Sequence, residues 1–321
     1  MSSLTLALVG GGALALGTLA YVRHREAKLR QAKLRQANRA FLDQLRFGTT
    51  STQGSREHME DRHDNTVAQN FSVFTVCDGH EGADAADFVC KNFARDFLSR
   101  APERSDLKSS LAASVLEMDG AFELEVAKGR LSPCGTTVVA AVVLKDEVVV
   151  AGTGDSRAVL SVKGRARSVV VEHSPCLPEE KERIEAMGAF IDSEGYLNGR
   201  IAVSRSVGDG HLKYGEESVP LIPHPDVGAV DLDDQTEFLV LSTDGVWLRP
   251  QTIIDIVRGS LRRSNSPQIA AEALVEAATS SPSAHDNVTV TVICFGPDAP
   301  PSLAPKTNRN SMLFGRGRKL K

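Results

Sequence analysis

Cysteine and aromatic residues are scarce in this sequence, and the cysteines form no recognisable pattern. Of 321 residues, five are Cys and one is Trp, and aromatic residues make up 5%. No two cysteines have the spacing of a zinc-binding pair, and an odd number of distant cysteines does not make a disulfide framework. The sequence therefore argues against a zinc-binding module and a disulfide-rich secreted domain, and it favours a reduced compartment. The cysteines are Cys77, Cys90, Cys134, Cys176 and Cys294.

Positive charge is also lacking over most of the chain. Residues 23–46 carry eight Lys or Arg and two acidic residues, and residues 298–321 carry six basic and one acidic. Of the 37 basic and 41 acidic residues in the whole chain, 23 basic and 38 acidic residues therefore lie in between, a net charge of about −15. Such an acidic middle argues against nucleic acid as a partner, because binding to phosphates needs an excess of positive charge. It suits either an ordinary soluble surface or a site that collects divalent cations.

One long uncharged run stands near the start of the sequence. Leu4 to Val22 contains no charged residue, and 19 residues are enough to span a bilayer as a helix. Positive charge follows the run and does not precede it, unlike in a cleavable signal peptide. We therefore predict a membrane anchor over residues 1–22, with the rest of the chain on the cytoplasmic side. A mitochondrial outer-membrane anchor has the same pattern, and an organelle-targeting presequence or a buried helix is the alternative.

Two basic segments flank the acidic middle. Residues 23–46 contain no helix breaker, and AKLRQ at 27–31 is repeated at 32–36, which predicts a basic helical stalk. The stalk could lie against anionic lipid head groups or could be a solvated linker. Residues 298–321 are rich in Pro, Asn and basic residues and predict a disordered tail. One folded domain is therefore expected over residues 47–297.

Within that domain, strand-like and helix-like patterns alternate. β-Branched and apolar runs predict strands, and Lys145 to Glu147 predicts a hairpin turn between two of them. Apolar residues at helical spacing predict helices. Hairpins dominate over strand–helix–strand crossovers, so the expected fold class is α+β, with antiparallel sheets and helices packed outside them. The expected strands are Phe71–Val76, Thr136–Leu144, Val148–Ala151, Ala158–Val162, Phe238–Leu241 and Val288–Phe295, and the expected helices are Ala83–Leu98, Leu107–Val126, Glu179–Met187, Thr252–Arg262 and Pro267–Ala278.

Five times, one or two acidic residues stand where an apolar stretch begins or ends. A carboxylate beside a buried strand is unfavourable unless a cation compensates its charge. Any one of them could be an ordinary turn residue, but the repetition indicates a shared site. Carboxylates without a His or Cys companion suit hard cations such as Mg²⁺ or Mn²⁺ rather than zinc. The residues are Glu60 with Asp61, Asp78, Asp155, Asp244 and Asp286.

The short motifs around these residues form an ordered series. They are REHMED at 56–61, DGH at 78–80, CGTT at 134–137, GDSR at 154–157, AVSRSVGD at 202–209, DGVW at 244–247 and DNVT at 286–289. Each motif alone is weak, but their number and order from about residue 54 to 295 are specific. The series resembles that of the metal-dependent serine/threonine protein phosphatases of type 2C.

The resemblance implies a central β-sandwich of two antiparallel sheets, flanked by α-helices, with two Mg²⁺ or Mn²⁺ ions at one end. Asp78 would bridge the two ions. Glu60 and the backbone carbonyl of Gly79 would complete one site, and Asp244 and Asp286 the other. The ions would lower the pKa of a bridging water, so that hydroxide is available near neutral pH. The reaction implied is hydrolysis of phosphoserine and phosphothreonine in proteins.

Three further residues receive roles from the same resemblance. Asp61 would hold metal-bound water through a hydrogen bond. Arg56 would bind the substrate phosphate, for which its forked and permanently charged guanidinium is suited. His80 would protonate the leaving serine or threonine oxygen, because an imidazole is a suitable acid near neutral pH.

The sequence departs from the family pattern beside two motifs. Glu81 follows the DGH motif, where many members have glycine. Leu248 follows the DGVW motif, where many members have an Asp that helps the equivalent of Asp155 to bind a third metal in some relatives. A third metal site at Asp155 is therefore in doubt. Residues 176–200 correspond to a flap that varies among members and shapes substrate choice.

The expected protein is a membrane-anchored phosphatase whose catalytic domain spans residues 47–297 and whose partners are phosphorylated proteins. The alternatives are a membrane-tethered scaffold with little activity and a hydrolase of small phosphate esters. The presence of all four expected acidic ligands favours the active phosphatase. Nothing in the sequence indicates obligate assembly, so we expect a monomer. Leu261 to Ser264 resembles a phosphorylation site for a basophilic kinase, and the alternative is an unmodified surface segment. Ser264 is expected in a loop between two helices.

Overall fold

The apolar runs of the sequence form two five-stranded antiparallel sheets in the computed structural model, which describes residues 23–30, 32–101, 106–215, 219–281 and 284–300. One sheet has the strand order β11-β7-β6-β3-β2 and the other β1-β13-β12-β8-β9. The first contains β2 (Arg62–Val67), β3 (Ser72–Cys77), β6 (Val138–Val143), β7 (Glu147–Thr153) and β11 (Asp226–Asp231). The second contains β1 (Arg46–Thr52), β8 (Arg157–Val162), β9 (Arg165–Ser168), β12 (Thr236–Ser242) and β13 (Val288–Cys294).

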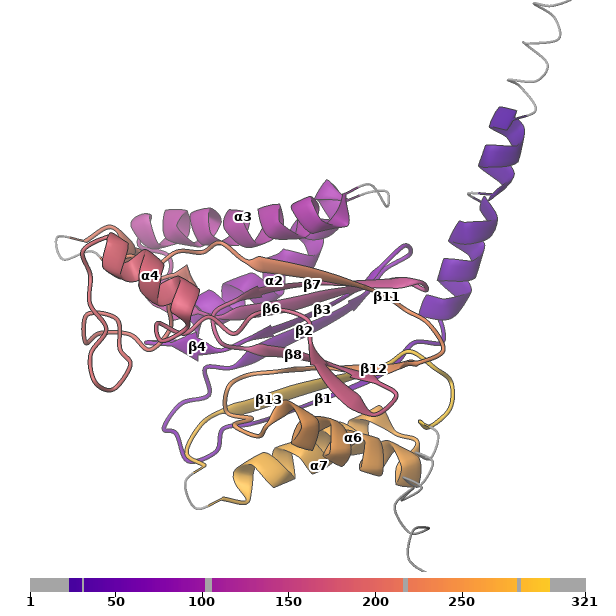
Figure 1. Ribbon diagram of the computed structural model, residues 1–321. Helices are drawn as coiled ribbons and strands as arrows, with labels where there is room; N and C mark the ends of the chain where they lie inside the picture. The colour runs from indigo at the N-terminus through magenta and orange to yellow at the C-terminus, as the bar shows by residue number, and fades with distance from the viewer. Residues whose placement is uncertain (1–22, 31, 102–105, 216–218, 282–283, 301–321) are drawn as a thin grey trace, which may run out of the picture.

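The two sheets pack face to face, and a pair of helices covers each outer face (Figure 1). Helices α2 (Asp84–Arg100) and α3 (Leu107–Ala127) pack on the sheet that contains β3. Helices α6 (Pro250–Ser264) and α7 (Pro267–Thr279) pack on the sheet that contains β13. This arrangement confirms the predicted α+β class with a central antiparallel sandwich.

Alternation along the buried strands explains why four layers form. In β6, Val138, Ala140 and Val142 face α2 and α3, whereas Val139, Ala141 and Val143 face the other sheet. Successive side chains of a strand point to opposite faces, so a strand that is apolar at every position must be covered on both sides. Between the sheets, the rings of Phe47 and Phe74 meet edge to face, with centroids 5.1 Å apart.

A short third sheet and two small helices lie at one end of the sandwich. The sheet consists of β4 (Gly79–His80), β5 (Gly135–Thr136) and β10 (Val207–Gly208), in the order β10-β5-β4. Helix α4 (Pro178–Ala186) belongs to the segment expected to form a flap, and α5 (Gly210–Lys213) follows β10. These elements surround the end of the sandwich at which the acidic residues gather.

All the predicted strands and helices have a counterpart in the structure, but four strands of the two five-stranded sheets were not predicted. Three of them, β1, β9 and β11, are rich in polar, charged or glycine residues, and their side chains are mostly half-buried or exposed. Their apolar alternation is too weak to indicate a strand, and pairing with a stronger neighbour stabilises them. β2 is likewise half-buried at a sheet edge. The prediction that Ser264 lies in a loop was wrong, because Ser264 is the last residue of α6 and its hydroxyl donates to the carbonyl of Ser260.

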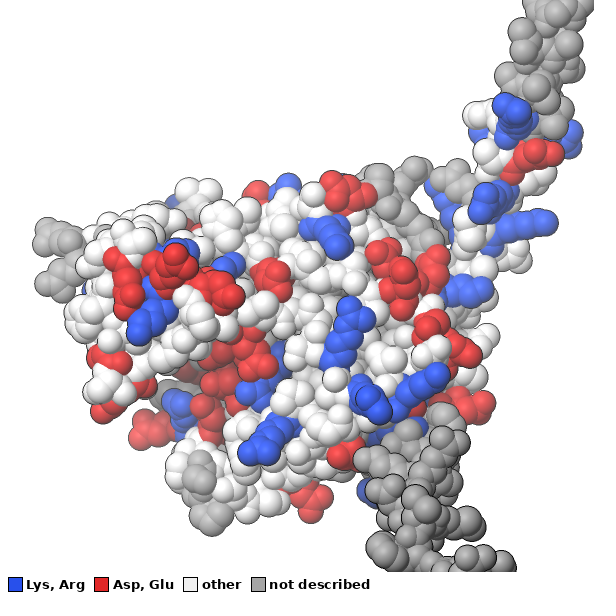
Figure 2. Space-filling model, in the orientation of Figure 1, with Lys and Arg blue, Asp and Glu red and all other residues white. Residues whose placement is uncertain are grey.

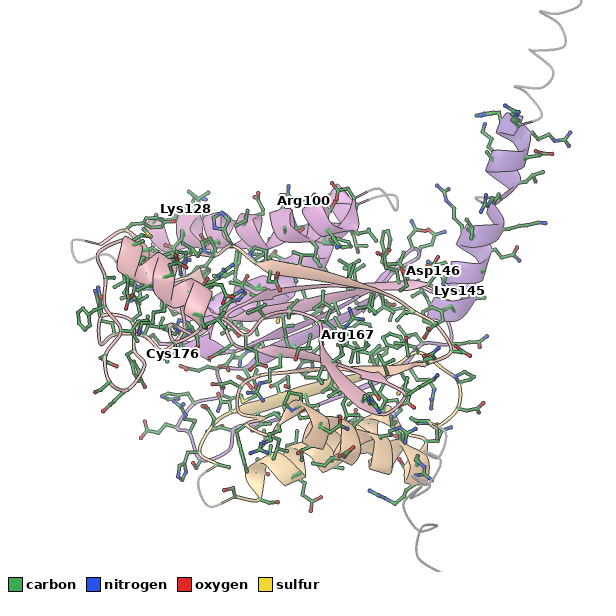
Figure 3. All side chains as sticks on the ribbon, viewed as in Figure 1. Arg100, Lys128, Lys145, Asp146, Arg167 and Cys176 are labelled. Carbon is green, nitrogen blue, oxygen red and sulfur yellow. The ribbon has the colours of Figure 1, made fainter. Side chains whose placement is uncertain are left out.

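The basic segment before β1 is helical at residues 23–30 and 32–42 and projects from the end of the sandwich opposite α4 (Figure 1). Its last turns are fixed to the folded domain. Leu42 is buried, and the buried side chain of Asn38 donates to the carbonyl of Asn70 and accepts from the amide of Lys145. Figure 3 shows Lys145 beside the base of this helix and Cys176 at the far end of the molecule. The last turns of the stalk therefore pack against the folded domain.

The predicted anchor over residues 1–22 and most of the predicted tail lie outside the described residues. Among the helices in the described part of the chain, none is long and apolar enough to cross a membrane.

Candidate active site

The registers of the two sheets bring the acidic residues to one end of the sandwich. Arg62 pairs with Cys77, so the start of β2 lies beside the end of β3 and places Glu60 near Asp78. In the other sheet Ser242 pairs with Val290, so the end of β12 lies beside the start of β13. The residues that follow β12 and precede β13 include Asp244 and Asp286. Antiparallel pairing thus gathers carboxylates that are far apart in the sequence.

These residues line a cleft of about 520 Å³ between the sandwich and the flap. All the predicted site residues except Asp61 are part of its wall. Figure 2 shows acidic side chains gathered at this end of the molecule and basic side chains along the stalk at the other. The wall includes Arg56, Glu60, Asp78, Gly79, His80, Asp155, Asp244 and Asp286, together with Glu81, Thr137, Tyr196, Arg200 and Asn287.

Three carboxylates of the cleft have raised pKa values. Burial, followed by repulsion from Asp61, Asp244 and Asp155, raises the pKa of Asp78 well above its usual value. Burial and the charge of Asp244 raise the pKa of Asp155 to about 7. The pKa of Asp244 is also raised, first by burial and then by repulsion from Asp286. A concentration of negative charge of this kind is unfavourable by itself and is relieved by protons or by cations.

Asp61 lies beneath the cleft and not in its wall. It is 2% exposed, and one of its carboxylate oxygens accepts a hydrogen bond of 3.0 Å from the hydroxyl of Thr243. Its other oxygen, Oδ1, has no hydrogen-bond partner among the described residues. Burial raises the pKa of Asp61 to about 6 despite the hydrogen bonds it accepts. A buried carboxylate oxygen without a donor is costly, and ordered water held by a cation would satisfy it.

Asn287 fixes the loop that carries Glu60. Its side-chain oxygen accepts from the amide of Glu60 at 2.8 Å, and its side-chain nitrogen donates to the carbonyls of Gln53 and His58. Asn287 is buried and belongs to the DNVT motif, in which only Asp286 was given a role. It is a functional residue that sequence reasoning missed, although its motif had been recognised.

Arg56 lies on the exposed side of the cleft and pairs with Asp286. Its guanidinium donates to a carboxylate oxygen of Asp286 at 2.9 Å, and this contact raises the pKa of Arg56 further above its already high value. The side chain is 59% exposed, so it can reach a ligand that enters the cleft. The structure thus places the predicted phosphate-binding residue beside a predicted metal ligand.

The donor set fits hard divalent cations. Every side chain predicted as a ligand offers oxygen, which Mg²⁺ and Mn²⁺ prefer. Gly79 also has to be glycine, because a Cβ there would lie 2.7 Å from the carbonyl oxygen of Glu60. Gly79 lies in the wall of the cleft, where its backbone closely approaches that of Glu60. The predicted residues therefore place oxygen donors together in the wall of one cleft.

A second group of candidate ligands lies beside the predicted one. The ligand atoms of Glu81, Asp209 and His211 lie within 4.8 Å of one another, the tightest grouping of this kind in the described residues. Nε2 of His211 lies 3.0 Å from a carboxylate oxygen of Glu81. Glu81 has a positive φ of 59°, a conformation that favours glycine. The departure from the family pattern at Glu81 therefore places a strained, charged residue at the edge of the cleft.

The imidazole of His80 is held by a buried carboxylate. His80 Nε2 lies 2.8 Å from Oδ2 of Asp209, whose side chain is 0% exposed. Burial alone would lower the pKa of His80, but the hydrogen bond and charge of Asp209 outweigh it and raise the pKa above the usual value. Asp209 ends the AVSRSVGD motif, and sequence reasoning gave it no role.

Leu248 does not contribute a ligand and packs instead against the core under α6 and α7. The carbonyls of Val246 and Leu248 each accept a hydrogen bond of 2.9 Å from Arg157, which also pairs with Glu172. Arg157 thus fixes the loop after Asp244. Asp155 lines the cleft as predicted, but no carboxylate stands at position 248 to share a third metal with it.

The flap is attached to the domain through a buried acidic residue. Glu180 in α4 is 1% exposed and pairs with Arg183 and Arg205. Burial alone would raise its pKa, but the two arginines lower the pKa of Glu180 to about 2. Beyond this anchor point, Tyr196 and Arg200 of the flap line the cleft. The flap therefore contributes directly to the surface that a substrate meets.

A four-layer sandwich with a carboxylate-lined cleft at one end is the arrangement that the resemblance in the sequence led us to expect. The sequence matches the model of the Protein phosphatase 2C family over residues 45–288, and the chain belongs to this family. It is a protein-serine/threonine phosphatase.

The relatives and solved structures that match the chain support this assignment. The chain is 34% identical over 300 residues to probable protein phosphatase 2C 22 of Arabidopsis thaliana, covering 87% of this chain and 76% of that protein. It is 34% identical over 296 residues to probable protein phosphatase 2C 57 of Oryza sativa subsp. japonica, covering 86% and 80%. The crystal structure of serine-threonine phosphatase 2C from Toxoplasma gondii shares the fold, with a TM-score of 0.66 and 21% identity over 78% of this chain and 95% of that chain.

Proposed function

We propose that the cleft hydrolyses phosphoserine and phosphothreonine in proteins with the help of two Mg²⁺ or Mn²⁺ ions. The observation that carries this proposal is the concentration of carboxylates with raised pKa values around Asp78. Glu60, Asp78, Asp244 and Asp286 line the same cleft with Gly79, and Asp286 pairs with one arginine, Arg56, whereas Glu180 pairs with two. A site with this excess of negative charge is suited to collecting cations.

The residues that would hold the ions are those that the sequence suggested. Asp78, Glu60, the carbonyl of Gly79, Asp244 and Asp286 would together hold them. When bound, the ions supply a nucleophile near neutral pH and stabilise negative charge on the transferred phosphoryl group. The proposal includes no firmly bound third ion, because Leu248 stands where the additional carboxylate would be needed.

The other residues bind the substrate and transfer a proton. Arg56 would bind two phosphate oxygens, and Asp286 competes for the same guanidinium. Asp61 would orient water beneath the cleft through its unpaired oxygen. His80 would donate a proton to the serine or threonine oxygen as its bond to phosphorus breaks. The retention of all these groups argues against the alternative of an inactive scaffold.

The test is release of phosphate from a phosphothreonine peptide by residues 23–321, which keep the stalk contacts. Release should require Mg²⁺ or Mn²⁺, stop in EDTA and disappear in the Asp244→Ala variant. Asp226→Ala is a matched control, because Asp226 lies at the start of β11 and outside the wall of the cleft. Metal-independent release, or full activity in Asp244→Ala, would contradict the proposal.

We also propose that the N-terminal segment holds the enzyme at a membrane with the catalytic domain in the cytoplasm, where it meets phosphorylated proteins as a monomer. The support is the uncharged run at 4–22 followed by basic residues. Because the stalk leaves the sandwich at the end opposite α4, an anchor there would direct the cleft away from the lipid surface (Figure 1). The mitochondrial outer membrane is the alternative location.

Cell fractionation of the full chain and of a variant without residues 1–22 tests this second proposal. The full chain should remain with membranes after a high-salt wash and should be accessible to added protease from the cytoplasmic side. The shortened chain should be released. Release of the full chain by salt alone would replace the anchor with an electrostatic contact of the stalk.

A further inference from the structure

The motif that ends in Asp209 has no role in the mechanism so far, although it lies directly behind the proposed acid. We propose that Asp209 is a positioning residue that holds the ring of His80 so that Nδ1, not Nε2, donates the proton to the leaving oxygen. This inference rests on the proposed function of His80 as the acid. It assigns the donating nitrogen and the residue that selects it.

The contact between the two side chains defines the orientation of the ring. Oδ2 of Asp209 lies 2.8 Å from Nε2 of His80. An ionised carboxylate only accepts hydrogen bonds, so Nε2 must carry a hydrogen in this pair. We infer that the other nitrogen, Nδ1, is the one left for a substrate in the cleft, whose wall includes His80.

Asp209 is itself fixed from several sides. The hydroxyl of Ser206 donates to Oδ2, and the amide of Asp209 donates to the carbonyl of Cys134 at 2.9 Å. The carboxylate also packs against the backbone of Gly135, where a Cβ would come within 2.3 Å of both of its oxygens. Asp209 adopts a left-handed conformation with φ of 58°. A residue held in a sparsely populated conformation with a fully buried side chain is one whose surroundings determine its position.

A buried ion pair supports the backbone on either side of Asp209. The ammonium of Lys213 pairs with Asp119 of α3 at 2.7 Å, and their side chains are 2% and 8% exposed. Lys213 also donates to the carbonyl of Ser206, and Asp119 accepts from the amide of Gly208 at 2.9 Å. The pair therefore ties both residues 206 and 208 to α3. Buried pairs that are also hydrogen-bonded are strongly directional.

Asp209 also has a chemical reason to stay ionised. Burial alone would raise its pKa, but the hydrogen bond and charge of His80, the hydrogen bond from Ser206 and the charge of Lys213 lower it. The carboxylate can therefore accept from His80 without taking the proton itself. This leaves the mobile proton on the side of the ring that faces the substrate.

In the proposed reaction, His80 gives one proton to the leaving oxygen. Water attacks phosphorus and forms the new phosphorus–oxygen bond, while the bond from phosphorus to the serine or threonine oxygen breaks. That oxygen takes the proton from Nδ1 of His80 and leaves as the alcohol. His80 is left neutral with the hydrogen on Nε2 still directed at Asp209, and the proton given up by the attacking water restores the charged ring through solvent.

Substrates with different leaving groups distinguish a positioning role of Asp209 from a structural one. A serine or threonine oxygen needs a proton as it leaves, whereas the p-nitrophenolate of p-nitrophenyl phosphate is stable without one. General acid catalysis contributes on the order of 10²–10⁴-fold, and loss of a partner that orients a catalytic group costs about 10–100-fold. We therefore expect Asp209→Asn to lower kcat on a phosphothreonine peptide about 10–100-fold and kcat on p-nitrophenyl phosphate less than about threefold.

Three further variants complete the experiment, all assayed as residues 23–321 with saturating Mn²⁺. His80→Ala should show the same selective loss with a larger magnitude. Ser206→Ala keeps the carboxylate but removes one of its donors, so a smaller loss confined to the peptide is expected. Glu123→Gln is the control, because Glu123 accepts from the amide of Gly210 beside Asp209 without touching His80. It should leave both substrates unchanged.

The outcomes separate this inference from the proposed function. An equal loss on both substrates in Asp209→Asn, or no loss on either, would overturn the positioning role. If Asp209→Asn does not fold, as judged by its thermal unfolding, Ser206→Ala decides by the same criterion. If His80→Ala itself shows no dependence on the leaving group, the proposed role of His80 fails, and activity that remains metal-dependent would still support the cation site.

Discussion

Two buried acidic regions of this phosphatase contain the same kinds of side chain and behave in opposite ways. In the flap, Glu180 is enclosed by Arg183 and Arg205, which lower its pKa to about 2. In the cleft, Asp78 and Asp155 are surrounded mainly by other carboxylates, and the pKa of Asp155 rises to about 7. Acidic residues with arginine partners hold the fold together. Acidic residues that are surrounded by other carboxylates keep an excess of negative charge, which is what a cation site requires.

The largest effect should come from removing charge at the centre of the cleft. Asp78→Asn should lower phosphatase activity on the order of 10³-fold or more, because several kcal/mol of transition-state stabilisation by cations depends on this ligand. The same variant should unfold at a higher temperature than the wild type in EDTA, because the neutral amide is not repelled by its neighbours. Phosphate release and thermal unfolding measure the two effects. A variant that is both inactive and less stable in EDTA would break the comparison.

Removing an acidic residue from the flap should lower the stability of the protein and leave its metal requirement unchanged. Glu180→Ala leaves two arginines without their partner in a mostly buried position, which should lower the free energy of unfolding by about 3 kcal/mol. Urea unfolding at pH 7.5 measures this loss. The Mn²⁺ concentration needed for half-maximal activity should not change, since Glu180 does not line the cleft. A large change in that concentration would mean that the two regions are not independent.

The contributions of the cleft and the flap to the free energy of unfolding should also depend on pH in opposite ways. The pKa of Asp155 is about 7 in the folded protein and near 3.8 in the unfolded chain. Between these values the folded state binds more protons, so the free energy of unfolding falls as the pH rises. In EDTA at pH 8, Asp155→Asn should therefore be more stable than the wild type by on the order of 2 kcal/mol. The difference should shrink at pH 5, and an equal difference at both values would contradict the raised pKa.

Glu180 should give the opposite slope. Its folded pKa of about 2 lies below the unfolded value of 4.5. Its contribution is present above the unfolded pKa and is lost as the pH falls from about 4.5 towards 2. The stability difference between the wild type and Glu180→Ala should accordingly narrow in acid, whereas that between the wild type and Asp155→Asn should widen in base.

The smallest effect is expected at the base of the stalk, where a buried polar group is fully satisfied. Asn38→Ala removes hydrogen bonds to Asn70 and Lys145 and should lower the free energy of unfolding by about 1–2 kcal/mol. Arg39→Ala, which breaks an exposed pair with Asp43, is the matched control and should cost less than about 0.5 kcal/mol. Equal losses in urea unfolding would mean that the stalk is not held by Asn38.

The parts of the fold that could be predicted from the sequence were those with strong apolar patterns. β3, β6 and β13 are buried on both faces and appear as nearly continuous apolar runs. β9 is RARS and β1 is RFGTTST, and neither has a pattern that indicates a strand by itself. These strands exist because β8 and β13 offer unpaired backbone groups at their edges. Pairing of that kind is a property of the assembled sheet.

The residues of the candidate site also divide into those that could be predicted from the sequence and those that could not. Glu60, Asp78, Asp244 and Asp286 could be predicted because each belongs to a short motif and carries an evident charge. Asn287 and Arg157 belong to recognised motifs, yet their hydrogen bonds to distant backbone groups gave no local signal. The prediction for Ser264 failed because the helix continues to the residue before Asn265, whose left-handed conformation ends it.

By itself, the sequence determined that this chain folds as an α+β sandwich and belongs with the type 2C phosphatases, because apolar periodicity and ordered acidic motifs are local properties. Only the tertiary structure decided which residues support the chemistry. Asp209 follows His80 by 129 positions, and their hydrogen bond exists because β4 and β10 both pair with β5. Contacts between residues so far apart depend on the register of the strands, and a register is set by the packing of the whole domain.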